Sequence, residues 1–165
     1  MKTMRIAAAT ALLACLATPA FAEGYAKFAG IKGTARNDGS GGWIQIESLQ
    51  EGLQNPVVFQ MGTTSGSSTS KPQSMGFVVT KAFDITSPDL RAAAASGAHY
   101  TDVTVDWGTA RFVLTDVVIT GVSTETTGAG LVEKIEFNGV ATRWTYQSGD
   151  VSNTKMWNYA TNSAK

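Results

Sequence analysis

The chain contains one histidine, His99, which is the first side chain to weigh as a catalytic group. A histidine can activate a serine nucleophile when an aspartate orients its ring, and serines and aspartates are plentiful here. No Gly-x-Ser-x-Gly turn that would present such a serine occurs, however. His99 also follows a predicted helix, and an imidazole at that place often binds the last carbonyl groups. We therefore predict a structural role for His99 and no enzymatic activity.

Paired carboxylates and metal ligands are the next chemistry to consider. Asp102 and Asp106 stand four residues apart, and a glycosidase needs two carboxylates at a set separation. On an alternating strand such aspartates usually face solvent, which is the interpretation favoured here. His99 is the only histidine, and the only cysteine, Cys15, lies in the N-terminal segment that is expected to be removed, so only carboxylates are left as metal ligands. No Asp-x-Asp-x-Asp-Gly loop is present. The sequence thus predicts no catalytic residue, no metal and no cofactor.

The four tryptophans leave two functions open. Trp43, Trp107, Trp144 and Trp157 could form a platform on which sugars stack, or they could belong to the core and to protein interfaces, the commoner use of tryptophan. The first possibility corresponds to a monomeric periplasmic or secreted binding or adhesive β-domain that uses exposed tryptophans. That domain remains the alternative to the function developed below.

Residues 1–22 have the organisation of a secretory signal peptide. Lys2 and Arg5 form a cationic head, Ile6–Ala17 is an apolar run, and a small-x-small cleavage pattern ends at Ala22, directly before Glu23. The run is about a dozen residues, whereas a membrane-spanning helix needs roughly 20. The sequence therefore predicts export without a membrane span, and cleavage between Ala22 and Glu23.

A second export route also fits the same segment. Leu12–Cys15 loosely matches the box at which a bacterial lipoprotein is cut and lipidated on its cysteine, so lipidation at Cys15 stays open as a minor alternative. Both routes place the protein in the periplasm or outside a bacterial cell. In the signal-peptide route Cys15 is removed, and residues 23–165 then lack any thiol or disulfide.

Residues 23–165 have the length of one domain with one core. They hold 11 basic and 13 acidic residues once Lys2 and Arg5 are removed, so they lack the basic footprint of a nucleic-acid-binding protein. Abundant Gly, Val, Thr and Ser disfavour a helical bundle. Short alternating runs separated by glycines predict a barrel or sandwich. Strands are expected at residues 25–31, 43–48, 77–83, 101–107, 111–122, 131–147 and 155–159.

One helix of about ten residues, 87–96, interrupts the strands. Ser87 is a good N-cap, Pro88 suits the first helical position, and Asp89 complements the positive end of the helix dipole. Leu90 and the alanines after it favour helix, and Gly97 is the expected left-handed stop.

A Gly/Ser-rich segment, 49–75, is predicted as a long extended loop. Its central part buries little apolar surface, and long loops inside a domain are often functional. It is either a passive linker or an arm that becomes ordered against another subunit. The residues proposed for contacts between subunits are Gly62, Thr63, Ser65, Gly66, Ser68 and Lys71.

Several segments together resemble the haemolysin-coregulated protein (Hcp) family, the tube subunits of bacterial type VI secretion systems. The most specific match is the strand and helix start at Phe83–Leu90, with its exit through Gly97 and His99. The residues that carry this helix motif are Ser87, Pro88, Leu90, Gly97 and His99. Weaker matches are segments 25–33, 42–48, 117–123, 132–137, 144–146 and 155–158.

The resemblance implies a β-barrel of two packed antiparallel sheets with one helix at its side. It also implies that six subunits close into a ring, that rings stack into a tube, and that the extended loop carries contacts between copies. Gln45, Glu47 and Gln50 would face the channel, where secreted cargo proteins are held. The chain departs from the family pattern in its signal peptide and in a short link at Asp106–Ala110.

Overall fold

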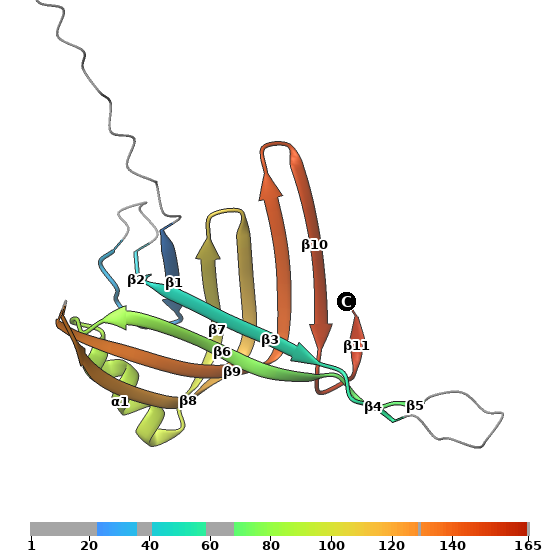
Figure 1. Cartoon of the computed structure of the whole chain (residues 1–165), viewed down its shortest axis with the longest axis horizontal. Coiled ribbons are helices and arrows are strands. Elements are labelled where there is room, and N and C mark those ends of the chain that lie inside the picture. Colours follow the sequence, from blue (N-terminus) through green and yellow to red (C-terminus); the bar gives the residue numbers. More distant parts are fainter. Residues whose placement is uncertain (1–22, 36–40, 59–67, 129, 165) are drawn as a thin grey trace, which may run out of the picture.

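The computed structural model describes residues 23–35, 41–58, 68–128 and 130–164. Most of them lie in β-strands, with one helix, so the prediction of a mainly β domain of the expected type is confirmed (Figure 1). The predicted signal peptide, including Ala22 and Cys15, lies outside the described residues. Nowhere in the described ranges is there a helix long and apolar enough to cross a membrane.

The elements are β1 (Gly24–Phe28), β2 (Trp43–Ile46), β3 (Ser48–Gln54), β4 (Val57–Val58), β5 (Ser68–Thr69), β6 (Gln73–Ala82), α1 (Ser87–Ser96), β7 (His99–Trp107), β8 (Ala110–Thr127), β9 (Gly130–Ser148), β10 (Val151–Asn158) and β11 (Ser163–Ala164).

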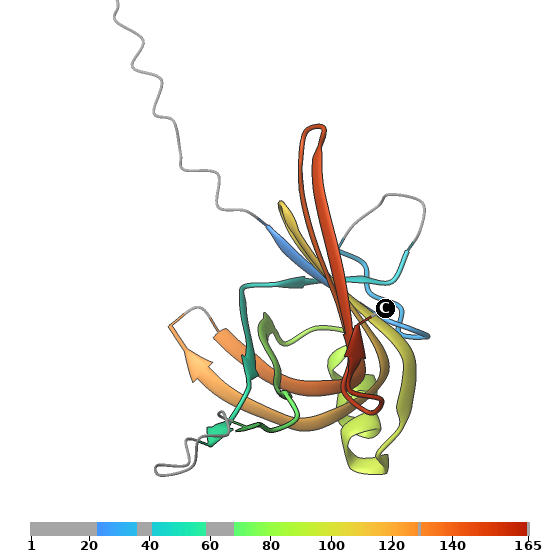
Figure 2. The same ribbon diagram turned by 90° about the vertical axis from the view of Figure 1, so that its right-hand side faces the viewer.

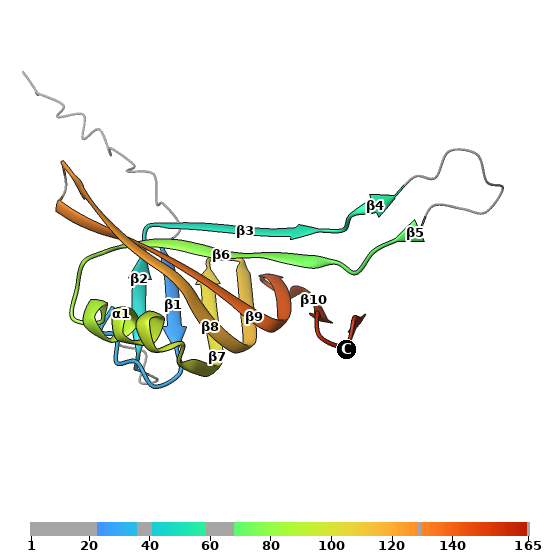
Figure 3. The same ribbon diagram turned by 90° about the horizontal axis from the view of Figure 1, so that it is seen from below.

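Two layers of strands make the barrel, and they belong to one hydrogen-bonded sheet. One path runs β11-β10-β9-β8-β7-β1-β2, while β6 pairs with β9 and β3 pairs with β6. The second layer therefore branches off β9 and crosses in front of the first (Figures 1 and 3). All the named ladders are antiparallel.

The two layers are joined at a corner between β2 and β3. Only Glu47 separates these strands, and its amide donates to the carbonyl of Thr80 on β6 (2.8 Å). The chain thereby passes from the partner of β1 to the partner of β6 without a loop. The ring of strands is completed by this bent connection rather than by a β2–β6 ladder.

The core lies between the layers and is rich in aromatic and β-branched side chains. Phe28 of β1 meets the ring of Phe137 edge-on at 5.3 Å, and Phe77 of β6 meets Phe112 of β8 at 5.5 Å. Edge-to-face pairs at such distances stabilise beyond the area they bury. Val103, Val105, Leu114, Val117 and Ile135 fill the remaining space and are inaccessible to solvent.

Strands β8 and β9 are long and curved, and each contributes to both layers (Figure 2). On β9 the buried residues Ile135, Phe137 and Ala141 share one parity, and Thr142 is buried as well. Gly139 lies between Phe137 and Ala141, and a Cβ there would stand 3.0 Å from the Thr115 carbonyl oxygen. The close approach of β8 therefore favours a residue without a side chain at this position.

Asp116 marks a local distortion of β8. Its φ is +50°, in the left-handed region, and its carboxylate lies 2.8 Å from Nδ1 of His99. We expect Asp116→Val to lower the free energy of unfolding by about 1–2 kcal/mol, since a β-branched residue is strained there. Asp116→Asn removes the same carboxylate but tolerates the backbone conformation, and should change stability by under about 0.5 kcal/mol. Urea unfolding of both variants measures this, and equal losses would contradict it.

Helix α1 spans Ser87–Ser96, and Gly97 ends it in the left-handed conformation at φ 65°. The prediction of Ser87 as N-cap is wrong by one residue, because Thr86 occupies that position. The Ser87 hydroxyl is instead buried, and it accepts hydrogen bonds from the Asp84 amide (2.9 Å) and from Lys81 Nζ (3.0 Å).

The segment 49–75 is less of a loop than expected. Strand β3 continues to Gln54 and β6 begins at Gln73, so both ends of the segment are paired strand. Together with β4 and β5 they form an arm that extends beyond the barrel (Figure 3). The glycines and serines of this segment do not favour strand by themselves, and the pairing of β3 with β6 makes both of its ends strand.

Candidate functional site

Four strand segments form a layer whose two edges have no strand partner among the described residues. They are β3, β6, the first half of β9 and residues 121–127 of β8, and we call them the arm layer. Strand β3 pairs only with β6. At the other edge, the β7–β8 ladder ends at Val118, so the rest of β8 pairs only with β9.

The direction of the backbone groups at the β8 edge follows from one hydrogen bond. The Phe83 amide donates to the Leu131 carbonyl (3.0 Å), so the backbone N–H and C=O of Leu131 point to the β6 side of β9. The backbone groups of successive residues in a strand point to opposite neighbouring strands. Those of Val132 therefore point to β8, where Glu125 is its partner in the ladder. The next residue, Thr126, must then direct its amide toward the open edge.

The same argument orients the β3 edge. The carbonyl of Thr80 accepts a hydrogen bond from the Glu47 amide, so the backbone groups of Thr80 point to β3. Those of Val78, two residues earlier, point the same way. Gln50 pairs with Val78 and is directed at β6. Leu49 and Glu51 consequently point their amides and carbonyls to the open side.

The face of the arm layer that is turned away from the barrel core is polar. It carries the exposed side chain of Gln50, a hydroxyl pair between Ser48 and Thr80 (2.7 Å), and an ion pair between Lys134 and Glu136 (2.8 Å). The ion pair places a charge of each sign on this face.

The three residues predicted for the channel do not all lie together. Gln50 is on the outward face of the arm layer, as described. Gln45 and Glu47 are also exposed, but they line a separate hollow of about 350 Å³ at the β2–β3 corner, with Ala82 and Asp84.

Of the residues predicted for the arm, the structure describes only two. Gly62, Thr63, Ser65 and Gly66 lie outside the described residues. Ser68 begins the short strand β5, and Lys71 is exposed just before β6.

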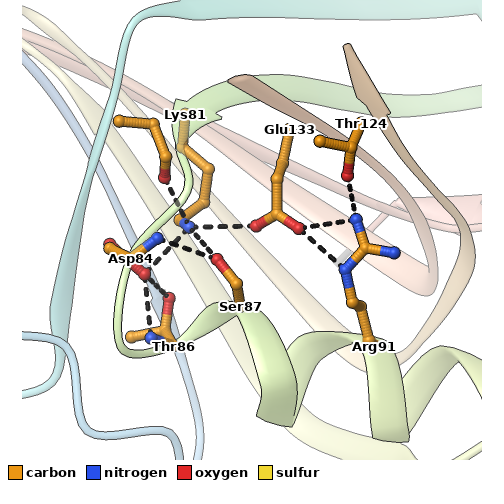
Figure 4. A network of polar contacts seen from close by, with 8 residues as sticks. Lys81, Asp84, Thr86, Ser87, Arg91, Thr124 and Glu133 are labelled. Carbon is orange, nitrogen blue, oxygen red and sulfur yellow. Dashed lines mark hydrogen bonds and ion pairs between the residues drawn. The ribbon is translucent and has the colours of Figure 1, made fainter. Parts of the chain in front are cut away.

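Beneath the arm layer, a buried network of charges fixes helix α1 to the barrel (Figure 4). Glu133 of β9 is 0% exposed and binds Lys81 Nζ of β6 (3.3 Å) and the Arg91 guanidinium of α1 (2.9 Å). Lys81 is 1% exposed and also contacts Asp84 (2.9 Å). Buried charges are tolerated only when they are paired in this way.

The helix motif singled out from the sequence thus holds α1 in place. Ser87 and Leu90 are both 0% exposed, the first bonded to Lys81 and the second in the core. Sequence reasoning missed Lys81 and Glu133, although Glu133 shares the parity of Ile135 and Phe137 and so had to point inward.

Asp84 gives the network a dependence on pH. Burial alone would raise the pKa of its carboxyl, but hydrogen bonds from Thr86 and the contact with Lys81 outweigh burial and lower that pKa below its ordinary value. The Asp84 carboxylate therefore stabilises the fold at pH values above the pKa that this carboxyl has in the unfolded chain. The contribution is lost as the pH falls through the lower pKa that it has in the folded chain.

We expect the free energy of unfolding to decline below about pH 4, and to decline less steeply in Asp84→Asn. Urea titrations between pH 2 and 7 would measure both slopes. Identical slopes in the two proteins would contradict the role given to Asp84.

The remaining candidate chemistry is dispersed. His99 pairs with Asp116 at the surface (2.8 Å), and within the described part of the chain no serine bonds to His99 to complete a catalytic triad. Asp106 does not face solvent as expected: it is 7% exposed and paired with Arg111 (2.8 Å). Within the described ranges no three His, Asp or Glu side chains gather to bind a metal.

The tryptophans do not form an exposed platform. Trp43 is buried at 7% exposure, and the other three are half-buried. Trp144 donates its indole N–H to Glu51 of the arm layer (3.0 Å), which ties β9 to β3. These rings serve mainly as packing within the domain.

Comparison with known proteins gives one family and many structures. The family described as "Type VI secretion system effector, Hcp" matches residues 25–146. The fold is similar to that of a type six secretion system protein (TM-score 0.77, 22% identity, 87% of this chain and 99% of the other). It is also similar to Hcp1 from Salmonella typhimurium (0.73, 17%, 87% and 98%) and to a type VI secretion system effector from Yersinia pestis (0.66, 18%, 82% and 98%). No curated protein matches the chain in sequence.

Proposed function

The chain belongs to the Hcp family of type VI secretion proteins, and on this premise we propose that it is an exported, ring-forming tube subunit. Members of this family form hexameric rings. The function is structural: six copies enclose a channel, and no chemical step is assigned to any side chain.

The open edges of the arm layer are the observation that supports this proposal. Unpaired strand edges readily add a strand from another chain. The order β3, β6, β9, β8 alternates in direction, so β8 of one copy and β3 of the next would again run antiparallel. Edge-to-edge contact uses two different surfaces and closes only as a ring. Six arm layers would then form one continuous barrel.

The channel of this ring would be lined by the polar face of the arm layer. Gln50, Ser48 and the Lys134–Glu136 pair lie on that face. Amide, hydroxyl and charged groups on this face suit a water-filled passage for small secreted proteins, because such groups stay hydrated. We assign Gln50 to the channel, and place Gln45 and Glu47 at its rim.

Export is the second part of the proposal. Family proteins are secreted components of the type VI apparatus, whereas residues 1–22 here predict the general export route. Glu23 is exposed at the start of the described chain, next to β1, so cleavage before it would leave the barrel intact. The intact mass of protein recovered from the periplasm or medium tests this part. A mass beginning at Glu23 is expected, and a mass that retains residues 1–22 would contradict it.

The ring itself is tested by the molar mass of the processed protein in solution. Light scattering after size-exclusion chromatography should give six times the chain mass at high micromolar concentration. A mass equal to one chain at all concentrations would contradict the proposal.

A further inference from the structure

The last stretch of β8, residues 121–127, has a strand beside it on one side only. The β7–β8 ladder ends at Val118, and the register of β8 against β9 shifts between Ile119 and Gly121. Beyond this shift β9 is the one strand that pairs with the stretch among the described residues. We call residues 121–127 the edge segment. A strand with one ladder opens more easily than a strand inside a sheet, so the position of the edge segment depends on what else holds it.

Helix α1 holds the edge segment through Thr124. This residue is the ladder partner of Glu133, so the two side chains lie next to each other on one face of the sheet. Arg91 of α1 reaches both of them. Its guanidinium binds the buried Glu133 carboxylate (2.9 Å) and donates a hydrogen bond to the Thr124 hydroxyl (Figure 4). One arginine therefore ties the helix, β9 and β8 together.

The backbone groups of Thr124 point to the open edge. The amide of Thr126 is directed there, and the backbone groups of Thr124, two residues earlier, point to the same side. A copy that pairs with this edge thus meets the amide and carbonyl of a residue whose hydroxyl is bound by α1. Hydrogen bonds weaken steeply as their geometry departs from the optimum, so the placement of Thr124 decides how well the edge can pair.

We infer that Arg91 is a positioning residue for the contact between copies: it holds the edge segment in the conformation that pairs with β3 of the next copy. The inference rests on the proposed function, because it concerns the edge through which the ring would form. Arginine suits this role, since its planar guanidinium presents several N–H donors in a fixed fork. Glu133, which is buried and also bound by Lys81, fixes one side of that fork. An edge that is held in advance loses less conformational freedom on association.

The variant Arg91→Lys separates positioning from stability. A lysine ammonium can still pair with the Glu133 carboxylate, but it lacks the fork that reaches Thr124 at the same time. Thermal unfolding should stay close to that of wild type. The protein concentration at which half of the chains are in rings, measured by sedimentation velocity, should rise about tenfold or more, because the edge must now be ordered during association.

Hydrogen exchange reports the edge segment in the single chain. At a concentration below that at which rings form, exchange followed by mass spectrometry should be about tenfold faster across residues 121–127 in Arg91→Lys than in wild type. Exchange across β7 should not change, because β7 is paired on both sides. A merely structural effect on the whole barrel would move both regions together.

A double-mutant cycle assigns the effect to the contact between Arg91 and Thr124. Thr124→Val removes the hydroxyl, keeps the backbone amide and favours strand, and it should raise the half-assembly concentration as Arg91→Lys does. The double variant should lie within about twofold of Arg91→Lys alone, because both changes remove the same contact. Ser87→Ala is the matched control. It weakens the network at Lys81, far from the edge segment, and should lower stability without changing the half-assembly concentration.

The outcomes distinguish the inference from the proposed function. Rings that form in Arg91→Lys and Thr124→Val at the wild-type concentration, or exchange of the edge segment that stays unchanged, overturn the inference and leave the proposed function intact. Additive losses in the double variant, or an equal loss in Ser87→Ala, overturn it in the same way. Wild-type protein that forms no ring overturns both.

Discussion

Replacing Glu133 by alanine is expected to lower the free energy of unfolding by about 3–5 kcal/mol. The substitution removes the carboxylate that binds both Lys81 and Arg91, and it leaves the ammonium of Lys81 buried at 1% exposure. It also leaves a cavity where β9 meets α1. Urea unfolding followed by tryptophan fluorescence would measure the loss.

Two controls identify charge pairing as the cause. Glu136→Ala removes an exposed carboxylate from the same strand, whose pair with Lys134 should contribute under about 1 kcal/mol. The double variant Lys81→Met with Glu133→Leu removes both buried charges and should recover most of the loss. Equal losses for Glu133→Ala and Glu136→Ala, or no recovery in the double variant, would contradict the account of this network.

Replacing Thr126 by proline is expected to abolish the ring without unfolding the barrel. The amide of Thr126 points to the open edge of β8, so proline removes no bond to β9, and edge strands tolerate proline. It removes one hydrogen-bond donor from each contact between copies, which should weaken each contact by about 1 kcal/mol or more. Every contact around the ring has the same loss. Sedimentation velocity should change from a ring to a single chain.

The control for this variant is Thr126→Ala, which keeps the amide and should keep the ring. Thr126 is exposed, so both substitutions should leave thermal unfolding within a few degrees of wild type. Rings that persist in Thr126→Pro would contradict edge pairing at β8.

Much of the local structure was predictable because it depends on neighbours in sequence. The helix follows from Pro88, the alanines and Gly97, and its span agrees with the structure. The strand expected at residues 101–107 alternates apolar and polar residues, and its Val103 and Val105 lie in the core. The Hcp resemblance, confirmed by the family match, then gave the arrangement of strands that periodicity alone could not.

The features that depend on distant partners were not predictable. Asp106 was expected in solvent, but Arg111 and the neighbouring strands cover it. Lys81 resembles any surface lysine until Glu133, 52 residues later, is brought beside it. The paired ends of the arm were hidden by glycine and serine for the same reason, since pairing with β6 rather than local propensity makes β3 a strand.

Electron microscopy of the processed chain tests the central claim most directly. The open edges of the arm layer predict annular particles whose class averages show sixfold symmetry around a central channel, with the layer lining that channel. Compact particles the size of one barrel, in a sample applied at high micromolar concentration, would contradict it.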